Sequence, residues 1–574
     1  MEKKKKLIIM GVILLLIIVS GATFAILTWN STMIKLGINT NCFTINYTKG
    51  NNITGSLKLI NEEDLISNGK FTIKDGVGVS AVNIGINSNC SIEGYGRILL
   101  NVTNISSTFT TGDSKGALKY AVLNNTSSIT DIKSITSTSL NSQSFDIVAM
   151  GSITSGGVKD ILVRQLSNTE LYKYIIVIYV DNNLAGNDIT EGVFTGNISA
   201  DATQGLINAD YTLNRLYNLN NSIVLDTTHT PDFTTVSGSN GKDNNNNTGL
   251  GDGTNGIYKS EDDFGTSYYF RGAVDNNYVK FANFYWRIIR INGDGTIRMI
   301  YAGTSAHTNG ESGTDSRIGT SKYNVNYKDN GYVGYMYGNF TTPTNCSTDD
   351  NNVTTCTGGS TSYEEAHANI NDSTIKTYID DWYNTYLSNY SYAIADTIYC
   401  NDRSVTPVES FASIALTGAG KGTENTAYSG LTRGYISHNP SLKCVNKNDR
   451  FTVKNNIGNA KLTNPVGLIS SDEVIMGGLT NYDIVNGAYI ANSDSYLTTD
   501  YWYWTLTPFA AAGGSSGVDL VGYVIFNRDL VVGGGNGGVR PVVSLSSDAI
   551  SGGNGTIDDP WIVVGYKVII VESE

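Results

Sequence analysis

The stretch WRIIRINGDGTIRMIY, residues Trp286 to Tyr301, decides how the second half of this 574-residue chain folds. Two apolar runs flank the sequence Asn292-Gly293-Asp294-Gly295. These four residue types accept the positive φ angles that tight hairpin turns require. The pattern therefore predicts an antiparallel β-hairpin whose strands belong to a hydrophobic core.

Two helices are predicted after this hairpin. Apolar and aromatic residues recur at helical spacing from Ile375 to Leu387, and Asn371 or Asp372 is a suitable N-cap. This spacing favours core packing over an aromatic ligand platform. Ser470-Ser471-Asp472-Glu473 has the spacing of a capping box, and Gly477-Gly478 ends the short helix that it predicts.

The remaining folded sequence reads as short strands, so the fold class is mainly β with a smaller α+β head. In the first region, runs broken by Asn, Gly and Ser suggest a β-sandwich, with strands at Cys42 to Tyr47, Arg97 to Val102, Leu118 to Leu123 and Lys173 to Val180. The tail is expected to return to strands at Tyr501 to Thr505, Gly522 to Phe526, Val539 to Leu545 and Trp561 to Val564.

The length exceeds that of one ordinary core and predicts several domains. Between the two folded regions, the run KDNNNNTGLGDGTNG, Lys242 to Gly256, is too polar to bury a core and predicts a linker. Its oxygen-bearing residues Asp243, Asn245, Asn247 and Asp252 suggest a calcium loop, but the closing glutamate is missing, so a solvated loop is favoured. The expected organisation is a signal or anchor at 1–29, a β-sandwich at 30–205, a linker at 206–255, a head domain at 256–566 and a tail at 567–574.

The N-terminus predicts export. Lys3 to Lys6 precede the uncharged stretch Leu7 to Trp29, which is long enough to cross a bilayer as a helix with the lysines inside the cell. Thr23-Phe24-Ala25 also offers the small residues of a signal-peptidase site. A membrane anchor through residues 7–29 and a cleaved signal therefore remain open. In the first case the chain is a single-pass surface protein with its C-terminus outside, and in the second it is secreted.

The cysteine count agrees with export. Six cysteines are an even number, and pairing between sequence neighbours would join Cys42 to Cys90, Cys346 to Cys356 and Cys400 to Cys444. Free buried thiols are the alternative, because sequence alone does not fix connectivity. No CxxC occurs, so zinc ribbons and thioredoxin chemistry are excluded.

The amino-acid composition argues against two further classes of protein. Charged residues are only 16% of the chain, the net charge is -13, and no basic stripe is present. An acidic exterior repels phosphate backbones, so nucleic-acid binding is not expected. The 35 tyrosines against 8 prolines argue for folded β-structure rather than a disordered stalk.

Two resemblances add to this interpretation. The segments GTSYYFRGAVDNNYVKF (265–281), FYWRIIRINGDGTIRMIY (284–301), YWYWTLTPF (501–509) and GVRPVVSL (538–545) resemble a large group of Firmicute and mycoplasma-relative surface proteins. The module they contain is similar to the C-type-lectin-like fold of formylglycine-generating enzymes and of variable proteins diversified by retroelements. The segments GATFAILTW (21–29) and VDNNLAGNDITEGVFTGNISADATQ (180–204) resemble TasA and camelysin-like exported fibre proteins, which implies a β-sandwich.

Catalytic motifs are missing from the sequence. The four histidines lie far apart, HExxH and GxSxG do not occur, and GGGNGG at 533–538 lacks the Lys-Ser/Thr of a phosphate loop. The neighbouring acids Asp262-Asp263 and Asp380-Asp381 are interpreted as solvated or capping residues, since neighbours in sequence diverge in space. Resemblance to formylglycine-generating enzymes would imply a late pair of catalytic thiols, and no cysteine follows Cys444. The sequence therefore predicts no enzyme and no cofactor.

The function predicted is non-catalytic adhesion at the cell surface, with a glycan or a surface protein as the partner. Loops late in the chain are the expected binding surface, because they combine glycine with polar and aromatic residues. The candidate ligand-binding residues are Phe509, Asp519, Tyr523, Asn527, Arg528, Asp529 and Asn536, although Phe509 and Tyr523 could equally pack in the core. The alternative is a structural subunit of a surface fibre or biofilm matrix, built by strand addition.

Overall fold

The structure is a computed structural model in which the described chain is mainly β and divides into two compact units. It describes residues 25–29, 43–50, 53–88, 94–125, 129, 131–166, 170–204, 207–239, 241–242, 247–310, 313–325, 329–340, 344–348, 354–411, 414–479, 491–492, 495–499, 501–512, 515–521, 526–530, 536–547 and 549–563. The first unit contains the chain up to Ile207 together with Asn389–Ala393, and the second contains Asn208–Ser388 and the chain from Ile394 onward. The division falls inside the stretch 206–255.

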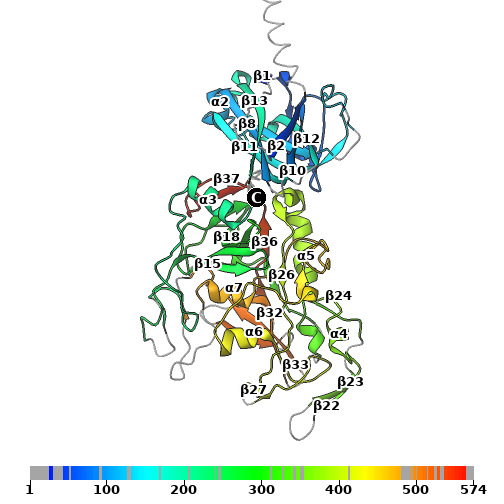
Figure 1. The fold of residues 1–574 in the computed structure, drawn as a ribbon, viewed down its shortest axis with the longest axis vertical. Coiled ribbons are helices and arrows are strands. Elements are labelled where there is room, and N and C mark those ends of the chain that lie inside the picture. Colours follow the sequence, from blue (N-terminus) through cyan, green and yellow to red (C-terminus); the bar gives the residue numbers. More distant parts are fainter. Residues whose placement is uncertain are drawn as a thin grey trace, which may run out of the picture. The chain divides into compact units, whose positions relative to one another are not determined.

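The first unit contains two sheets, drawn in blue and cyan in Figure 1. One has five strands in the order β11 (Gly157–Leu166), β8 (Gly94–Ile105), β13 (Val193–Gln204), β1 (Ala25–Trp29) and β3 (Thr54–Leu57). The other has eight strands, β2 (Phe43–Lys49), β7 (Gly78–Ser88), β12 (Leu171–Asp181), β9 (Leu118–Asn124), β10 (Ser144–Ser152), β6 (Lys70–Thr72) and β5 (Ile66–Ser67), with β4 (Leu59–Ile60) beside β12. The four strands predicted for this region are confirmed as parts of β2, β8, β9 and β12.

Strand β1 corrects the extent of the predicted N-terminal span. Residues Ile26 to Trp29 pair in parallel with Val193 to Gly196 of β13, and β3 pairs with β1 on its other side. The last five residues of the stretch 7–29 are therefore strand, and the rest of that stretch lies outside the described residues. Within the part of the chain that is described, no helix is both long and apolar enough to span a bilayer.

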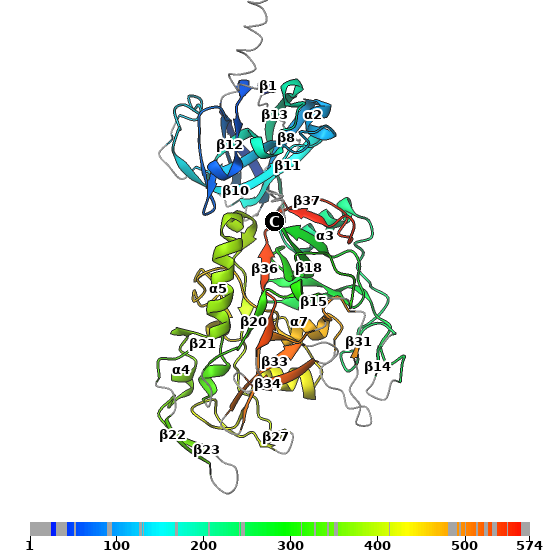
Figure 2. The same ribbon diagram turned by 180° about the vertical axis from the view of Figure 1, so that it is seen from behind.

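The second unit is built around the predicted hairpin, which the structure confirms as β18 (Phe284–Ile291) and β19 (Ile297–Gly303). Figures 1 and 2 show β18 and β36 near the centre of this unit, and α5 lies to one side of β36 in both views. The sheet has nine strands. Its order is β25 (Ile394–Ala395), β36 (Val542–Leu545), β19, β18, β17 (Tyr278–Phe281), β38 (Trp561–Val563) and β37 (Ile550–Gly552), with β16 (Gly265–Arg271) and β15 (Gly256–Asp262) joined through β18.

A second sheet of this unit has six strands. Its order is β20 (Gly319–Ser321), β35 (Gly537–Val539), β32 (Tyr503–Ala512), β33 (Ser515–Val521) and β34 (Phe526–Leu530), with β29 (Thr426–Ala427) beside β32. The predicted tail strands at 501–505, 539–545 and 561–564 appear in β32, β35, β36 and β38. The predicted strand at 522–526 is described only at Phe526, where β34 begins.

Helix α3 (Ala209–Leu219) corrects the predicted linker. Asn208 caps the helix by accepting a hydrogen bond from the Tyr211 amide at 3.0 Å, and the buried Thr212 donates to the Gly295 carbonyl at 2.6 Å. The helix thus packs on the turn of the central hairpin. Further along, Asp252 pairs with Arg271 at 2.9 Å and is nearly buried, so it is not a solvated loop residue. Sequence reasoning missed this segment because its apolar residues are few.

The other helices agree with their predicted positions. Helix α5 (Thr374–Tyr386) is confirmed, but its N-cap is Ser373, whose hydroxyl accepts from the Lys376 amide, and Asn371–Asp372 form strand β24 instead. Its buried face packs in the core, whereas Tyr378 and Tyr386 are exposed. Helix α7 (Ser471–Met476) has the predicted capping box. Short helical segments of the second unit include α4 (Tyr363–Ala366), α6 (Ser429–Leu431) and the π-helix η7 (Thr432–Ile436), and those of the first unit include α2 (Ser107–Thr110) and the 3-10 turn η1 (Glu62–Asp64).

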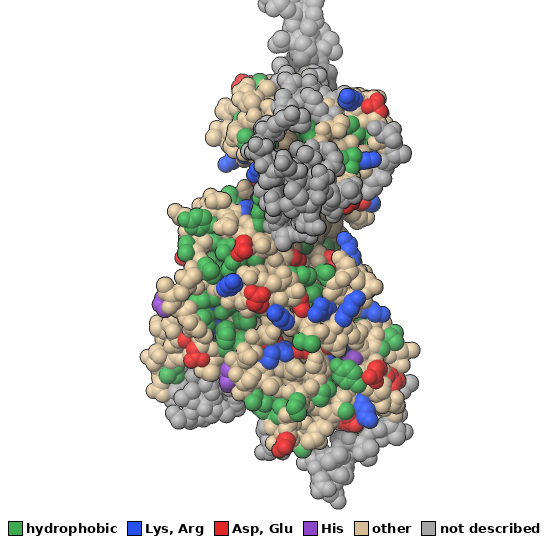
Figure 3. Space-filling model, in the orientation of Figure 1, with side chains coloured by type: hydrophobic (Ala, Val, Ile, Leu, Met, Phe, Trp, Pro, Cys, Tyr) green, Lys and Arg blue, Asp and Glu red, His purple; other side chains and the backbone are tan. Residues whose placement is uncertain are grey.

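The surface matches the low charge content of the sequence. On the face of the second unit seen in Figure 3, most of the surface is neutral polar or apolar, and several basic side chains lie near one another across its middle.

Candidate functional site

A polar cleft in the second unit is the candidate site. Its hollow measures about 560 Å³, a volume that includes the open solvent at its mouth. It is formed where the β15–β16 turn, the central hairpin, β26 (Tyr399–Cys400), η7 and the start of α7 meet. The lining residues are Asp262, Asp263, Phe264, Arg290, Asn292, Arg298, Ile398, Cys400, Asp402, Arg433, Ser441, Leu442, Lys443, Ser470, Asp472, Glu473 and Thr507.

One wall is a group of ion pairs that we name the Glu473 cluster, formed by Glu473, Arg290, Arg298 and Asp262. Arg290 Nε lies 3.0 Å from Glu473 Oε1, and Arg298 Nε lies 2.6 Å from the same oxygen. Arg290 Nη1 also pairs with Asp262 Oδ2 at 2.6 Å. The other oxygen of Glu473 accepts from the Ser470 amide at 2.9 Å, so the residue that caps α7 also fixes the two arginines of the hairpin.

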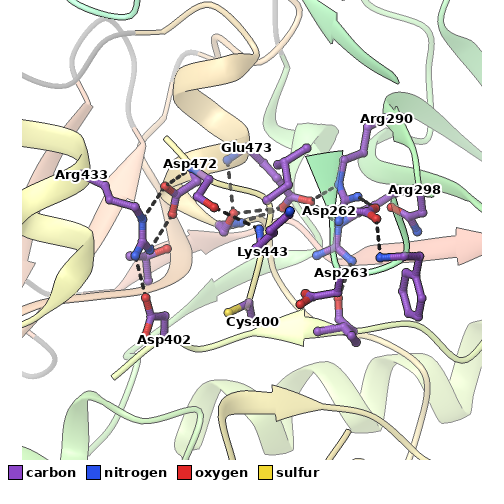
Figure 4. Close-up of a pocket in the computed structure, with 17 residues that line it drawn as sticks. Asp262, Asp263, Arg290, Arg298, Cys400, Asp402, Arg433, Lys443, Asp472 and Glu473 are labelled. Carbon is purple, nitrogen blue, oxygen red and sulfur yellow. Dashed lines mark hydrogen bonds and ion pairs between the residues drawn. The ribbon is translucent and has the colours of Figure 1, made fainter. Parts of the chain in front are cut away.

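The opposite wall is the Arg433 cluster, formed by Arg433, Asp402 and Asp472. Arg433 contacts Asp472 through two bonds, Nε to Oδ1 at 2.7 Å and Nη2 to Oδ2 at 2.9 Å, and reaches Asp402 Oδ2 through Nη1 at 2.6 Å. Two such bonds to one carboxylate hold the plane of the guanidinium group in one orientation. Figure 4 shows Arg433 pointing toward Asp402 and Asp472, with the Glu473 cluster on the other side of the view.

Less buried groups stand nearer the solvent. Asp263 and Phe264 are partly exposed, and Lys443 is exposed and makes no ion pair with any residue that the structure describes. Asp263 pairs with Arg450 at 3.0 Å and accepts from the Cys444 amide at 2.8 Å. The bond between Cys400 and Cys444, with a Cα–Cα distance of 5.7 Å, ties these segments together and confirms the predicted pairing.

Burial and pairing set the electrostatics of the cleft. Burial opposes ionisation of Glu473, but Arg298 and Arg290 outweigh it and hold the pKa of that carboxyl below its ordinary value. Burial also works against the charge of Arg433, yet Asp472 and Asp402 raise its pKa. Asp263 differs, because desolvation raises its pKa more than the Cys444 amide and Arg450 lower it. The cleft therefore has a charged interior and a less strongly ionised carboxyl toward its edge.

This arrangement can hold a polar ligand in a fixed orientation. The carboxylates are engaged by guanidinium or amide groups, and Cys400 is in a disulfide, so it is no thiolate nucleophile. Among the described residues, no group of three or more His, Cys, Asp or Glu is placed to hold a metal ion. The ordered donors and acceptors suit hydrogen bonding to a ligand with many polar groups.

The acidic neighbours singled out in the sequence have structural partners. Asp262 is buried against Arg290, which corrects the expectation of a solvated residue, while Asp263 turns to Arg450. Asp380 pairs with Lys376 at 2.7 Å, and Asp381 is exposed. Neither pair brings two free carboxyl groups together.

Five of the six predicted ligand-binding residues that the structure describes lie in strands rather than in loops. Phe509 is 1% exposed and packs against Phe411 and Tyr435, so it is a core residue. Asp519 lies in β33 opposite Arg528 of β34, and Asn527 and Asp529 occupy other β34 positions, so these four residues belong to strands rather than loops. Asn536 is exposed, and its carbonyl accepts from the Tyr501 hydroxyl. Tyr523 lies outside the described residues.

The remaining cysteines are only partly described. Cys346 and Cys356 lie in β22 (Thr344–Thr348) and β23 (Thr354–Thr357), which pair antiparallel through Thr344 with Thr357 and Ser347 with Thr355. This places their backbones on adjacent strands, and their bond remains a prediction. Cys42 and Cys90 lie outside the described residues.

Sequence reasoning missed the cleft although its signal was present. Arg290 and Arg298 interrupt the apolar runs of the hairpin in a chain with few charges. A charged residue in a core strand needs a partner, because an unpaired buried charge is costly. The capping-box spacing identifies Glu473 only as a capping residue, but Glu473 is the partner that these two arginines require, and its neighbour Asp472 pairs with Arg433.

Comparison with known proteins does not assign this chain to a family. No protein-family model matches this chain, and no curated protein matches it significantly. The function is therefore argued from the geometry of the cleft.

Proposed function

We propose that this chain is an exported cell-surface protein whose second unit binds a glycan in the cleft, without catalysis. The observation that carries the proposal is the pairing of cleft carboxylates with guanidinium groups, which leaves a lining of fixed hydrogen-bonding groups with the exposed amine of Lys443 beside them. Sugars present many hydroxyl groups in fixed directions, and such a lining can both donate to them and accept from them. Phe264 at the edge adds an apolar surface for the C–H face of a ring.

We further propose the finer fold assignments, a β-sandwich for the first unit and a C-type-lectin-like fold for the second. The two sheets of the first unit support the former. The hairpin at the centre of the second unit and the resembling segments around it support the latter. The lysine-flanked apolar leader and the disulfide support export, with the chain anchored in the membrane or released from it.

Binding to immobilised glycans and to purified bacterial cell-wall polymer tests the proposal. We expect the intact chain to bind, and we expect Lys443→Glu and Phe264→Ala to weaken binding at least about tenfold, or about 1.4 kcal/mol. Lys447→Glu is the matched control, because Lys447 is an exposed lysine of the same segment that does not line the cleft. It should bind like the unmodified chain.

A second variant separates the cleft from the late strands. Replacing Asp519, Asn527, Arg528 and Asp529 together by Ala should leave binding intact if the cleft is the site. Loss of binding in this variant, with normal binding by Lys443→Glu and Phe264→Ala, would refute the cleft and favour the β33–β34 hairpin. Release of shortened glycan products would refute the non-catalytic assignment.

A further inference from the structure

A buried group of charged side chains in the first unit has no part in the cleft. Lys119 stands on β9, Asp181 ends β12 and Glu62 lies in η1. Their side chains are 4%, 1% and 6% exposed. The sequence separates Lys119 from Asp181 by 62 positions and from Glu62 by 57, so only the fold brings them together.

The lysine amine lies between the two carboxyl groups. Lys119 Nζ is 2.5 Å from Glu62 Oε2 and 3.0 Å from Asp181 Oδ2. Tyr179 donates its hydroxyl to the same Glu62 oxygen at 2.8 Å. The amine of Lys119 thus contacts two carboxyl groups. Glu62 is fixed by a second donor, the Tyr179 hydroxyl, whereas Asp181 has other partners.

The Asp181 carboxyl is held in the way an acyl group is held for attack. Its Oδ1 accepts from the Glu62 amide at 3.3 Å and from the Asn183 amide at 3.1 Å, whereas its Oδ2 faces the Lys119 amine. Two backbone N–H groups on one oxygen stabilise the negative charge that develops there during addition to the carbon. The other oxygen is the one free to leave.

We infer that Lys119 and Asp181 condense into an intramolecular amide bond, with Glu62 as the proton carrier. The ammonium first gives one proton to Asp181 Oδ2, which leaves a neutral amine and a neutral carboxylic acid. The Nζ lone pair then adds to Cγ, and the C–O π electrons move to Oδ1. Glu62 accepts a proton from the nitrogen and delivers it to Oδ2, the Cγ–Oδ2 bond breaks, and one water leaves. The ammonium and the carboxylate become one amide and one water, so atoms and charge balance without an oxidant, a reductant or a second substrate.

Three features favour reaction over a permanent ion pair. The Lys119 amine already contacts the carboxyl group that it would attack, with Nζ 3.0 Å from Asp181 Oδ2, so no large movement is needed to bring the two groups together. Burial removes solvation from both charges, a cost that a neutral amide does not carry. Burial also limits access of the water that would hydrolyse the product. The resulting bond would join the ends of a segment that includes β9, β10, β11 and β12.

Peptide mapping of the full-length chain tests the inference. After denaturation, reduction and trypsin digestion, the bond would block cleavage at Lys119 and join the peptide of residues 116–133 to that of residues 174–215. We expect this branched peptide, lighter by one water than the sum of its two parts, to account for most of the Lys119-containing material. Detection of only the two unlinked peptides, with cleavage after Lys119, would overturn the inference.

The first unit supplies a matched internal control. Lys58 Nζ lies 2.7 Å from Asp75 Oδ2, but both side chains are 58% exposed, so the same two residue types at a similar distance should give no linked peptide. Linkage of both pairs to the same extent would show that burial and the Asp181 amides do not matter, which would refute the mechanism. In Glu62→Gln the linked fraction should fall at least tenfold, and wild-type linkage in that variant would refute the role of Glu62. The result for the unmodified chain decides whether the bond exists, even if a variant fails to fold.

Discussion

Replacing Glu473 by Gln isolates the charge that holds one wall of the cleft together. The side chain is 4% exposed and its Oε1 lies 3.0 Å from Arg290 Nε and 2.6 Å from Arg298 Nε. Gln keeps the size of the side chain and its oxygen acceptor, so the cap on the Ser470 amide can persist. The change therefore removes mainly the negative charge.

The expected loss of unfolding free energy follows from the partners that Arg290 and Arg298 keep in the variant. Arg290 keeps Asp262 at 2.6 Å, but Arg298 loses the carboxylate that it contacts and keeps the Ile398 carbonyl at 3.2 Å. Leaving a buried charge without its partner costs about 3 to 5 kcal/mol of unfolding free energy. We expect Glu473→Gln to destabilise the second unit by this amount.

Urea unfolding followed by tryptophan fluorescence measures the effect. Five of the six tryptophans, all except Trp29, belong to the second unit, so the signal reports on it. Glu424→Gln is the matched control, because Glu424 pairs with Lys421 at 3.8 Å with both side chains well exposed. Exposed pairs contribute about 0 to 1 kcal/mol, and the control should lose no more than that.

The pH dependence provides a second check. The pKa of Glu473 is held below its ordinary value of 4.5, so its ionised form stabilises the fold fully above that value and the contribution is lost as pH falls through the lower folded pKa. The difference between Glu473→Gln and the unmodified chain should therefore shrink in acid. A loss below about 1 kcal/mol at pH 7, equal to that of the control, would refute the argument that this ion pair supports the wall.

Three further predictions concern stability. Replacing Cys400 and Cys444 together by Ser should lower the unfolding free energy of the second unit by about 2 to 5 kcal/mol in chemical denaturation without reductant, and an unchanged value would contradict a stabilising role of this bond. Phe509→Ala should cost about 3 to 5 kcal/mol because Phe509 is a core residue, whereas the exposed Asn536→Ala should change stability by less than about 0.5 kcal/mol. Equal thermal shifts for these two variants would contradict the assignment of Phe509 to the core. Burial lowers the pKa of His367 from 6.5 to about 2, so the unfolded chain binds a proton that the folded chain refuses, and stability should fall as pH drops below 6.5. The slope should approach about 1.4 kcal/mol per pH unit; His367→Gln should remove this component between pH 6.5 and 5, and an unchanged slope would show that His367 titrates freely in the folded state.

Local patterns of the sequence were sufficient to predict most secondary structure. The turn residues Asn292 to Gly295 specified the hairpin, and the Ser470–Glu473 spacing specified α7 with its cap. These signals act between near neighbours, so they survive without knowledge of the fold. The N-cap of α5 was misassigned by one or two positions because Asn371, Asp372 and Ser373 are all suitable caps.

Contacts between distant residues were not predictable in the same way. In the Glu473 cluster, Arg290 pairs with a carboxylate 183 positions away, and no local pattern selects one carboxylate for a given arginine. The polar residues and nearby glycines of β33 and β34 are also typical of recognition loops, so the local pattern predicts loops where the structure has strands. A charge inside an apolar strand, as with Arg290 or Lys119, is the usable signal that such a contact exists.

The position of β1 has a mechanical consequence. The strand is the last part of the apolar stretch 7–29 and is paired on both sides, with β13 in parallel and with β3 antiparallel. A force transmitted along the chain at Ala25 therefore acts along the strand axis, across hydrogen bonds that lie roughly perpendicular to it. The hydrogen bonds of β1 to β13 and to β3 must therefore break together. Hydrogen bonds that are pulled along their own direction break one after another instead. If the leader stays in the membrane, the first sheet is thus loaded in its more resistant direction whenever the distal part of the protein is pulled.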